Sequence, residues 1–584
     1  MRYEKLSPAL AVAVDDFERD GLRALALHVD NLGVVSVDET PKPPRVVVFV
    51  HPREGADLEH LRASGIELNG NAVGGGVRTA IVAVSDLAAL SEDPAVARIV
   101  PAERLHPLMD KARAAVKVPA FRRSSKLSGK GVIIGIVDTG LEVGHPDVAG
   151  RVLRVWDQTL HGPGVPEGGY GVELRGAAMS QSRDTVGHGT HVAAIAAGAD
   201  PTFTGVAPRA ELVIVKSDLL TAHIADGIRY IFRVAAELDR PAVVNLSLGG
   251  HGDAHDGSDS LSTVIDDAVG PGRIVCCAAG NEGNANIHAQ VLVARNRTRT
   301  IACSMARRGP NDPAFVAAYN GWYSGRDRMQ VAVVAPSDAA TPFQAVLTSG
   351  SPVRDYSLPE GGVRIITPGP DPANGDVNFV VLIEPGPSAP PPAPTSTGAW
   401  RLRLKGTRVS TGTVDVWTID GRVSQFTGRT VVDNMKVGSP GAAGRALTLA
   451  SYTTKVAWQD MFGNPHQSGL ELDDISDFSS EGPRRDGVEK PDLAAPGAMI
   501  AAAQSVHAGA QPDFLVDTLH TIKAGTSMAT PFAAGLVALL LERQPDLKPD
   551  DARQLLRRNA RIPGRPQDTW DQKWGYGLIN AKGL

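Results

Sequence analysis

Gly525-Thr526-Ser527-Met528-Ala529-Thr530-Pro531 leads into an apolar run that extends from Phe532 to Leu541. Small residues followed by such a run predict a turn that enters a buried helix. The first N–H groups of a helix lack intrahelical partners, so they can donate hydrogen bonds to a developing anion. Ser527 is therefore either an ordinary helix N-cap or a nucleophile whose own amide stabilises the oxyanion that it creates.

Two upstream stretches supply the base and the orienting carboxylate that a serine nucleophile needs. The β-branched run Val132–Val137 predicts a fully buried strand, and Asp138 follows it directly. Open α/β sheets place their sites at the carboxyl ends of such strands. His188 lies between Gly187 and Gly189 at the start of a small-residue helix, so a serine and a substrate can approach its ring. This context favours the nucleophile over the cap.

The chain resembles the subtilisin-like serine proteases (subtilases) over residues 130–290 and 430–584. Four motifs match family signatures in the family's order: Asp138-Thr139-Gly140, Gly187-His188-Gly189-Thr190-His191, Ala278-Ala279-Gly280-Asn281-Glu282-Gly283 and Gly525-Thr526-Ser527-Met528-Ala529. The resemblance implies a triad of Asp138, His188 and Ser527. It also implies an oxyanion hole formed by the side-chain amide of Asn281 and the backbone N–H of Ser527.

The resemblance further implies a pocket for the P1 side chain of a substrate. Its walls are expected to be Ser247-Leu248-Gly249-Gly250 and Ala278-Ala279-Gly280, with Gly438 as the floor. Glu282 is expected at the rim, where its carboxylate disfavours acidic P1 groups and favours Lys or Arg by about 1 kcal/mol. We therefore expect large apolar or basic P1 residues.

The sequence pattern divides the chain into six parts. Residues 41–105 alternate strand and helix in a way that resembles the subtilase propeptide, a folding chaperone and inhibitor in that family. Alternating apolar residues and turn signals between the two halves of the core predict an antiparallel β-sandwich. It resembles the jelly-roll insert of the branch that includes clostridial spore-germination proteases. The expected parts are an extension (1–40), a propeptide-like domain (41–105), a connector (106–129), the core (130–290 and 433–584) and the insert (291–432).

The expected fold class is therefore α/β, with a subtilisin-like, doubly wound, mostly parallel sheet. An N-terminal α+β propeptide-like domain and an inserted antiparallel β-sandwich complete it.

Composition excludes several other classes of protein. The 584 residues carry a net charge of -5 with no basic block, so nucleic acid is not an expected partner. No apolar run approaches the roughly 18 residues of a membrane span.

Three cysteines cannot form a disulfide framework, and we expect them reduced in a cytoplasmic protein. The Asn-rich calcium loop of many secreted subtilases is missing before Gly205, and Asp184 and Asp200 are too few for a calcium cage, so we expect neither metal nor cofactor.

The sequence thus predicts a serine endopeptidase that acts on protein or peptide substrates. It is expected to process its own propeptide and to be inhibited intramolecularly by its N-terminal domain. A catalytically silent binding protein on the same fold is disfavoured because all four catalytic groups are present. An enzyme that cuts only itself and then acts as a regulatory or binding partner stays open, because self-processing uses the same site.

Overall fold

The computed structural model describes residues 1–20, 34–36, 44–53, 55–63, 66–69, 76–101, 106–107, 116–305, 316–346, 351–384 and 399–584. Parts of the predicted extension (21–33 and 37–40), of the connector (108–115) and of the insert (306–315, 347–350 and 385–398) lie outside the described residues.

An eight-stranded sheet forms the centre of the catalytic core, in the order β28-β25-β13-β11-β7-β10-β8-β9. Neighbouring strands are parallel except at the edge, where β9 runs antiparallel to β8. The strands are β7 (Ile133–Asp138), β8 (Val152–Asp157), β9 (Val172–Leu174), β10 (Glu211–Lys216), β11 (Ala242–Leu246), β13 (Arg273–Ala278), β25 (Leu447–Thr453) and β28 (Leu493–Ala498).

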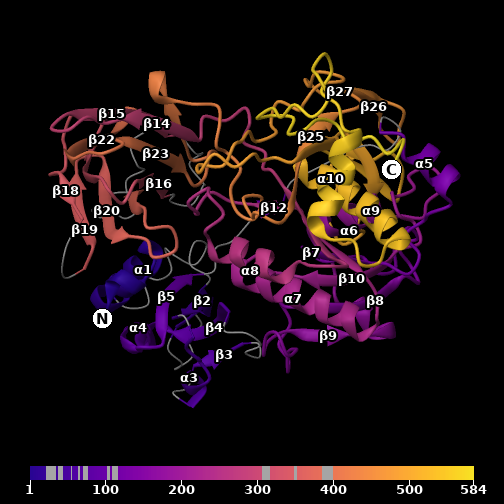
Figure 1. Ribbon diagram of the computed structural model, residues 1–584, viewed down its shortest axis with the longest axis horizontal. Helices are drawn as coiled ribbons and strands as arrows, with labels where there is room; N and C mark the ends of the chain where they lie inside the picture. Colours follow the sequence, from indigo (N-terminus) through magenta and orange to yellow (C-terminus); the bar gives the residue numbers. More distant parts are fainter. Residues whose placement is uncertain are drawn as a thin grey trace.

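Helices cover both faces of this sheet, because successive strand residues point to opposite sides and both sides are apolar. Ile134 and Ile136 pack in one cluster with α6 (His188–Ala197) and α9 (Thr526–Arg543). Ile133 and Val137 pack in another with α7 (Thr221–Glu237) and α8 (Ser260–Ala268). Figure 1 shows these helix pairs on opposite sides of the strands. The doubly wound core expected from the sequence is confirmed. Two further helices are α5 (Val118–Ser125) and α10 (Pro549–Asn559).

The N-terminal region forms its own antiparallel sheet, in the order β1-β2-β4-β3 with β5 beside β2. It packs with α1 and α4 around a separate apolar cluster. Its elements are η1 (Tyr3–Lys5), α1 (Pro8–Asp20), β1 (Val34–Ser36), β2 (Arg45–Pro52), α3 (His60–Ala63), β3 (Glu67–Leu68), β4 (Arg78–Ala83), η3 (Val84–Asp86), α4 (Leu87–Glu92) and β5 (Val96–Pro101).

The insert leaves the core after β13 and returns before β25, two neighbouring strands of the central sheet. It consists of two antiparallel sheets, β14-β23-β16-β21-β20-β19 and β18-β17-β22-β15-β24, which share one apolar core. The strands are β14 (His288–Leu292), β15 (Thr298–Met305), β16 (Ala317–Tyr323), β17 (Arg328–Val334), β18 (Gln344–Ala345), β19 (Val353–Leu358), β20 (Gly361–Pro370), β21 (Val377–Glu384), β22 (Ala399–Arg408), β23 (Thr413–Thr418) and β24 (Ser424–Thr427). This confirms the expected sandwich.

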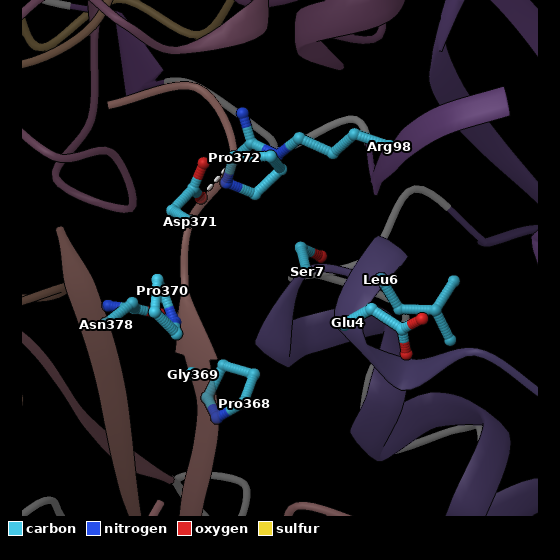
Figure 2. Close-up of a pocket in the computed structure, with 10 residues that line it drawn as sticks. All are labelled: Glu4, Leu6, Ser7, Arg98, Pro368, Gly369, Pro370, Asp371, Pro372 and Asn378. Atoms are coloured by element: carbon cyan, nitrogen blue, oxygen red, sulfur yellow. Dashed lines mark hydrogen bonds and ion pairs between the residues drawn. The ribbon is translucent and has the colours of Figure 1, made fainter. Parts of the chain in front are cut away.

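The N-terminal region contacts both the insert and the core. Arg98 forms an ion pair with Asp371 of the insert (2.5 Å), beside a small cavity of about 20 Å³ that Leu6 and Ser7 also line, as Figure 2 shows. On the core side, the hydroxyl of Thr79 donates to the carboxylate of Asp226 on α7 (2.8 Å). The N-terminal region therefore packs against both the insert and the core, and Figure 1 shows it below the two.

Short elements complete the chain. The pair β6 (His106–Pro107) and β12 (Leu248–Gly249) is considered below with the substrate site. The remaining elements are η4 (Gly176–Gln181), η5 (Gly428–Thr430), β26 (Ala457–Gln459), β27 (Pro465–Gln467), β29 (Ile500–Ala503), η6 (Pro512–Phe514) and β30 (His520–Lys523). Within the described residues, no helix combines the length and apolar character that a bilayer crossing requires.

Candidate active site

The carboxylate of Asp138 and the ring of His188 meet where β7 ends and α6 begins. Oδ1 of Asp138 lies 2.7 Å from Nδ1 of His188 and also accepts the N–H of Thr139 at 2.8 Å. Both side chains are at most 1% exposed. Gly189 permits this approach, because a Cβ there would lie 2.1 Å from the carbonyl oxygen of Gly140. Since a carboxylate only accepts, Nδ1 carries a proton and Nε2 is the ring's basic nitrogen.

Asp184 holds this pair in place and was not assigned a catalytic part from the sequence. One carboxylate oxygen accepts from the N–H of Gly187 (2.7 Å) and the hydroxyl of Thr139 (2.9 Å). The other accepts from the N–H and the hydroxyl of Thr190. A single buried carboxylate thus caps the first turn of α6 and joins it to the loop after β7. The sequence alone does not reveal this role, because it depends on where α6 begins.

Ser527 is the second residue of α9 and is fully buried. Its hydroxyl donates to the carbonyl oxygen of Ser247 at 2.9 Å, and the hydroxyl of Ser247 donates to the carbonyl oxygen of Ser527 at 2.7 Å. These two bonds join the start of α9 to the first predicted pocket wall. Nucleophilic attack requires a base to accept the proton that the Ser247 carbonyl accepts here.

The amide of Asn281 is oriented by Thr526, the residue before the serine. Its Oδ1 accepts from the N–H of Thr526 at 2.9 Å and from the hydroxyl of Thr526 at 3.0 Å. With the oxygen engaged by two donors, the NH₂ group of Asn281 is the end left to donate elsewhere. Gly280 precedes it at φ +115°, where a Cβ would lie 2.6 Å from the hydroxyl oxygen of Ser480. Glycine is therefore required to turn Asn281 toward α9.

The two predicted pocket walls leave the sheet side by side. Strands β11 and β13 are parallel neighbours with Leu246 opposite Cys277, so Ser247 and Ala278 follow at the same edge. Leu248 and Gly249 form β12, and Ala279 continues the other wall toward Gly280. Gly438 abuts Gly250, because a Cβ on Gly438 would lie 2.1 Å from the Gly250 carbonyl oxygen. The predicted wall and floor residues thus come together from three separate stretches of chain.

The carboxylate of Glu282 is held by neighbouring groups of the protein itself. Its Oε2 accepts from the N–H of Asn281 (2.7 Å) and the hydroxyl of Ser480 (3.0 Å), and it lies 3.4 Å from Nε2 of His251. Burial alone would raise the pKa of Glu282, but the hydrogen bond and charge of His251, together with the N–H of Asn281, lower it below its usual value. The carboxylate is ionised and accepts a hydrogen bond from the backbone N–H of Asn281.

Two groups of side chains in the described residues have ligand atoms within 4.8 Å of one another: Asp147, Asp200 and His520, and Asp460, His466 and Asp513. In the first, His520 lies 2.9 Å from Asp517 and 3.3 Å from Asp147. In the second, His466 lies 3.0 Å from Asp460. The sequence did not suggest these groups, because 373 residues separate Asp147 from His520. Each histidine already has a carboxylate partner, so an ion is not needed to explain either group.

The family model described as the subtilase family matches residues 129–361 and 420–577. Serine protease AprX of Bacillus subtilis (strain 168) is 29% identical over 175 residues, which cover 29% of this chain and 36% of AprX. Thermitase of Thermoactinomyces vulgaris is 31% identical over 247 residues, which cover 39% of this chain and 77% of thermitase. Among solved structures, the Clostridium perfringens CspB protease aligns with a TM-score of 0.65 and 22% identity over 80% of this chain and 97% of that one. The last likeness is one of fold.

Proposed function

The chain belongs to the subtilase family, and on that premise we propose that it is a serine endopeptidase acting on peptide or protein substrates. The observation that carries the proposal is the pairing of Asp138 with His188 at 2.7 Å, in a site where Asn281 has its oxygen engaged and its NH₂ group available. A base with one proton fixed on Nδ1 and a separate amide donor are the two groups that acyl transfer needs.

In the proposed reaction, Nε2 of His188 takes the proton of Ser527 as the serine oxygen attacks the carbonyl carbon of the scissile bond. The carbonyl oxygen becomes an oxyanion, which the NH₂ group of Asn281 and the N–H of Ser527 stabilise. The imidazolium of His188, held by Asp138, gives its proton to the leaving amine. Water then attacks the acyl-enzyme by the same route, with His188 again as base, and releases the acid.

The pocket supports large P1 side chains, because both walls and Gly438 are small or lined by backbone. The bonds of Glu282 to Asn281, Ser480 and His251 direct that carboxylate toward the enzyme. Its attraction for a basic P1 group is therefore partly screened, so we expect large apolar residues to lead, basic ones to follow and acidic ones to be disfavoured.

The N-terminal domain is proposed to act as an intramolecular inhibitor that the enzyme itself processes. In β6, Pro107 pairs with Leu248 and His106 with Gly249, antiparallel to the pocket strand β12. An extended peptide added to a strand edge is a common mode of peptide recognition. This pairing supports the proposal that the segment after the N-terminal domain takes a substrate's place, and self-processing is expected within the connector, residues 106–129.

Intact mass spectrometry of the wild type beside Ser527→Ala tests the function. We expect the wild type to be cut within the connector and to gain one adduct with a fluorophosphonate, while Ser527→Ala stays whole and unlabelled. The variant's loss of turnover should be about 10⁶-fold in kcat. Thr530→Ala, which removes a hydroxyl one turn along α9, serves as a control because its hydroxyl donates only to the carbonyl of Thr526. A wild type that neither processes nor labels would contradict the proposal.

A second candidate is an enzyme that cuts only itself and then acts as a regulatory or binding partner. It is favoured by the contacts of the N-terminal region with two bodies, through Thr79 to the core and through Arg98 and Arg19 to Asp371 and Asp355 of the insert. Size-exclusion chromatography of processed protein separates the two candidates. A fragment that stays bound, with no cleavage of added peptides, supports the second; free turnover of peptides supports the first.

We also propose that the protein works in a reducing compartment such as the cytoplasm. Cys276, Cys277 and Cys303 are all buried and unpaired. Burial raises the pKa of Cys303 to about 12, so its thiol stays protonated. Buried thiols of this kind do not form disulfides, which fits cytosolic usage.

A further inference from the structure

Four buried rings with nearly parallel planes form a row, called the ring stack below, that crosses from the catalytic core into the insert; His251 lies edge to edge with His255, and His255, Trp417 and His288 lie face to face. His251 and His255 lie 5.3 Å apart between ring centroids, His255 and Trp417 4.1 Å, and Trp417 and His288 4.5 Å. Successive ring planes are within 9° of parallel. No ring is more than 7% exposed. His251 and His255 follow β12 in the core, whereas His288 on β14 and Trp417 on β23 are a cross-strand pair of the insert.

The core end of this stack reaches the oxyanion hole. Nε2 of His251 lies 3.4 Å from Oε2 of Glu282, and the same oxygen accepts the backbone N–H of Asn281 at 2.7 Å. Two contacts therefore separate the first ring of the stack from the residue that supplies the oxyanion amide.

The hydrogen-bond partners indicate which ring nitrogens of His251 and His255 carry protons. The carbonyl oxygen of Asp253 and the carboxylate of Glu282 only accept, so Nδ1 of His255 and Nε2 of His251 carry protons. Burial holds the pKa of His255 well below its usual value, so its Nε2 is unprotonated and accepts from Nδ1 of His251 at 3.0 Å. His251 thus links His255 to the carboxylate of Glu282.

The insert end is anchored where the insert leaves and re-enters the core. Nε1 of Trp417 donates to the carbonyl oxygen of Met435 at 2.8 Å, and Nδ1 of His288 lies 2.9 Å from the carbonyl oxygen of Asn434. A third insert residue, Asn320, donates to the carbonyl oxygens of His251 (3.1 Å) and Asp253 (2.7 Å). The loop that carries the two core histidines is therefore fixed by the insert at its backbone and at its rings.

We propose that this ring stack is a positioning device through which the β-sandwich insert fixes Glu282, and through Glu282 the amide of Asn281. The inference rests on the proposed endopeptidase function and gives the insert a part in it. His251, His255, Trp417 and His288 touch no substrate in this scheme and are positioning residues. Their loss should affect the transition state, where the oxyanion forms, more than ground-state binding.

The test compares Trp417→Leu and His251→Leu with Trp400→Leu in the full chain, using a peptide substrate. Trp400 is an equally buried insert tryptophan that packs in the sandwich core, away from the stack. We expect the two stack variants to lose about 10-fold in kcat with KM unchanged, less than the roughly 10²–10³ for removal of an oxyanion donor. Trp400→Leu should lower thermal stability but not kcat. Trp417→Phe, which keeps a flat ring, should restore most of the activity.

A double-mutant cycle then identifies the target of the stack. If it acts through Asn281, His251→Leu should cost nothing further in kcat when Asn281 is already alanine, because coupled residues are not additive. Full additivity, or stack variants that behave like Trp400→Leu, would overturn the inference. If Trp417→Leu does not fold, His251→Leu decides alone, since it leaves the insert untouched. Absence of any turnover in the folded wild type would instead contradict the endopeptidase function itself.

Discussion

Two histidine–carboxylate pairs belong to the proposed active site, and they are built differently: His188 and Asp138 are both buried, whereas the side chain of Glu282 is 29% exposed beside the buried His251. His188 and Asp138 lie 2.7 Å apart, at the ends of a helix and a strand that belong to the central sheet. His251 and Glu282 lie 3.4 Å apart on two loops, and Asn320 of the insert donates to the carbonyl oxygen of His251. In the first pair, Nδ1 of His188 is bound to its carboxylate, and the proposed mechanism uses Nε2 as the base. In the second pair, the histidine has both nitrogens committed, to Glu282 and to His255.

The difference shows that partner geometry, and not residue type, decides what a histidine–carboxylate pair can do. A proton shuttle needs a nitrogen that gains and loses a proton during the reaction, and His188 meets that requirement. His251 has a different place, because its carboxylate partner binds the backbone N–H of Asn281, the proposed oxyanion donor. Variants of each pair should therefore have effects of different size.

The largest contrast is expected from Asp138→Asn, which keeps the size of the side chain but removes an acceptor-only group. An amide can present a donor to Nδ1 of His188, which then holds its proton on Nε2 and cannot act as a base. We expect kcat to fall by about 10⁴-fold with the fold intact. Stopped-flow or steady-state assays of peptide cleavage measure this, with circular dichroism as the folding control. A loss below tenfold would mean that Asp138 does not orient the base.

The next largest loss of kcat is expected from Asn281→Ala. This change removes the side-chain donor, while Thr526 keeps its other bonds. We expect a loss of about 10²–10³ in kcat and little change in KM, because the amide binds the oxyanion and not the ground state. The assay is steady-state peptide cleavage, with thermal melting to verify the fold. Normal turnover would show that the oxyanion is held by other groups.

Asp184→Asn tests how far the first pair depends on its support. The amide cannot accept at both ends, so it loses the two bonds from Thr190 or those from Gly187 and Thr139. The start of α6 should shift, and misplacement of His188 should cost up to about 10² in kcat. Asp571→Asn is a matched control, because Asp571 also accepts backbone N–H groups but in a C-terminal turn. Equal effects of the two changes would mean that only stability is lost.

Glu282→Gln is the corresponding change in the second pair and should cost only about 10-fold in kcat, since the Asn281 amide is shifted but not removed. The amide oxygen can still accept one of the donors that Oε2 now accepts. Kinetics at fixed pH measure the effect, and a loss as large as that of Asp138→Asn would erase the distinction between the pairs.

The first pair could be predicted from the sequence because its residues lie in short motifs. Asp138 ends an apolar strand and His188 opens a helix between glycines, so local pattern alone locates both. The doubly wound sheet and the sandwich were equally visible, through continuous and alternating apolar runs respectively.

The second pair could not be predicted in this way. His251 and Glu282 are in loops without periodicity, and Trp417 meets His255 only because the insert folds back on the core. Asp184 was weighed only as a metal ligand, since its cap bonds require knowledge of where α6 begins. Contacts between separate bodies depend on tertiary packing, which leaves no periodic signal in the sequence.

The smallest expected effect is on the docking of the N-terminal domain to the core. It involves a histidine and a carboxylate that are both buried at this interface but do not pair with each other. Asp226 of the core accepts from Thr79 of the N-terminal domain, and burial raises its pKa to about 6 from 3.8, although Arg229 lies 3.5 Å away. His51 of the N-terminal domain contacts Ser260 of the core at 2.8 Å, and burial, then the charge of Arg98, lower its pKa to about 3 from 6.5.

The two groups give docking of the N-terminal domain opposite pH dependences. Asp226 favours docking when protonated, so its contribution is full below pH 3.8 and is lost as pH rises through about 6. His51 favours docking when neutral, so its contribution is full above pH 6.5 and is lost as pH falls toward about 3. Between pH 7.5 and 5, linkage gives about a tenfold gain in affinity from Asp226 and about a thirtyfold loss from His51. The wild type should therefore change only a few-fold.

Single variants should separate the opposing contributions. In Ser527→Ala protein nicked in the connector by an added protease, dissociation constants at pH 5 and 7.5 report docking. Asp226→Asn should weaken docking about thirtyfold on acidification, because only His51 then titrates. His51→Gln, whose amide can still bond to Ser260, should strengthen docking about tenfold over the same range. Parallel pH profiles in the two variants would mean that docking desolvates neither group and would contradict the prediction.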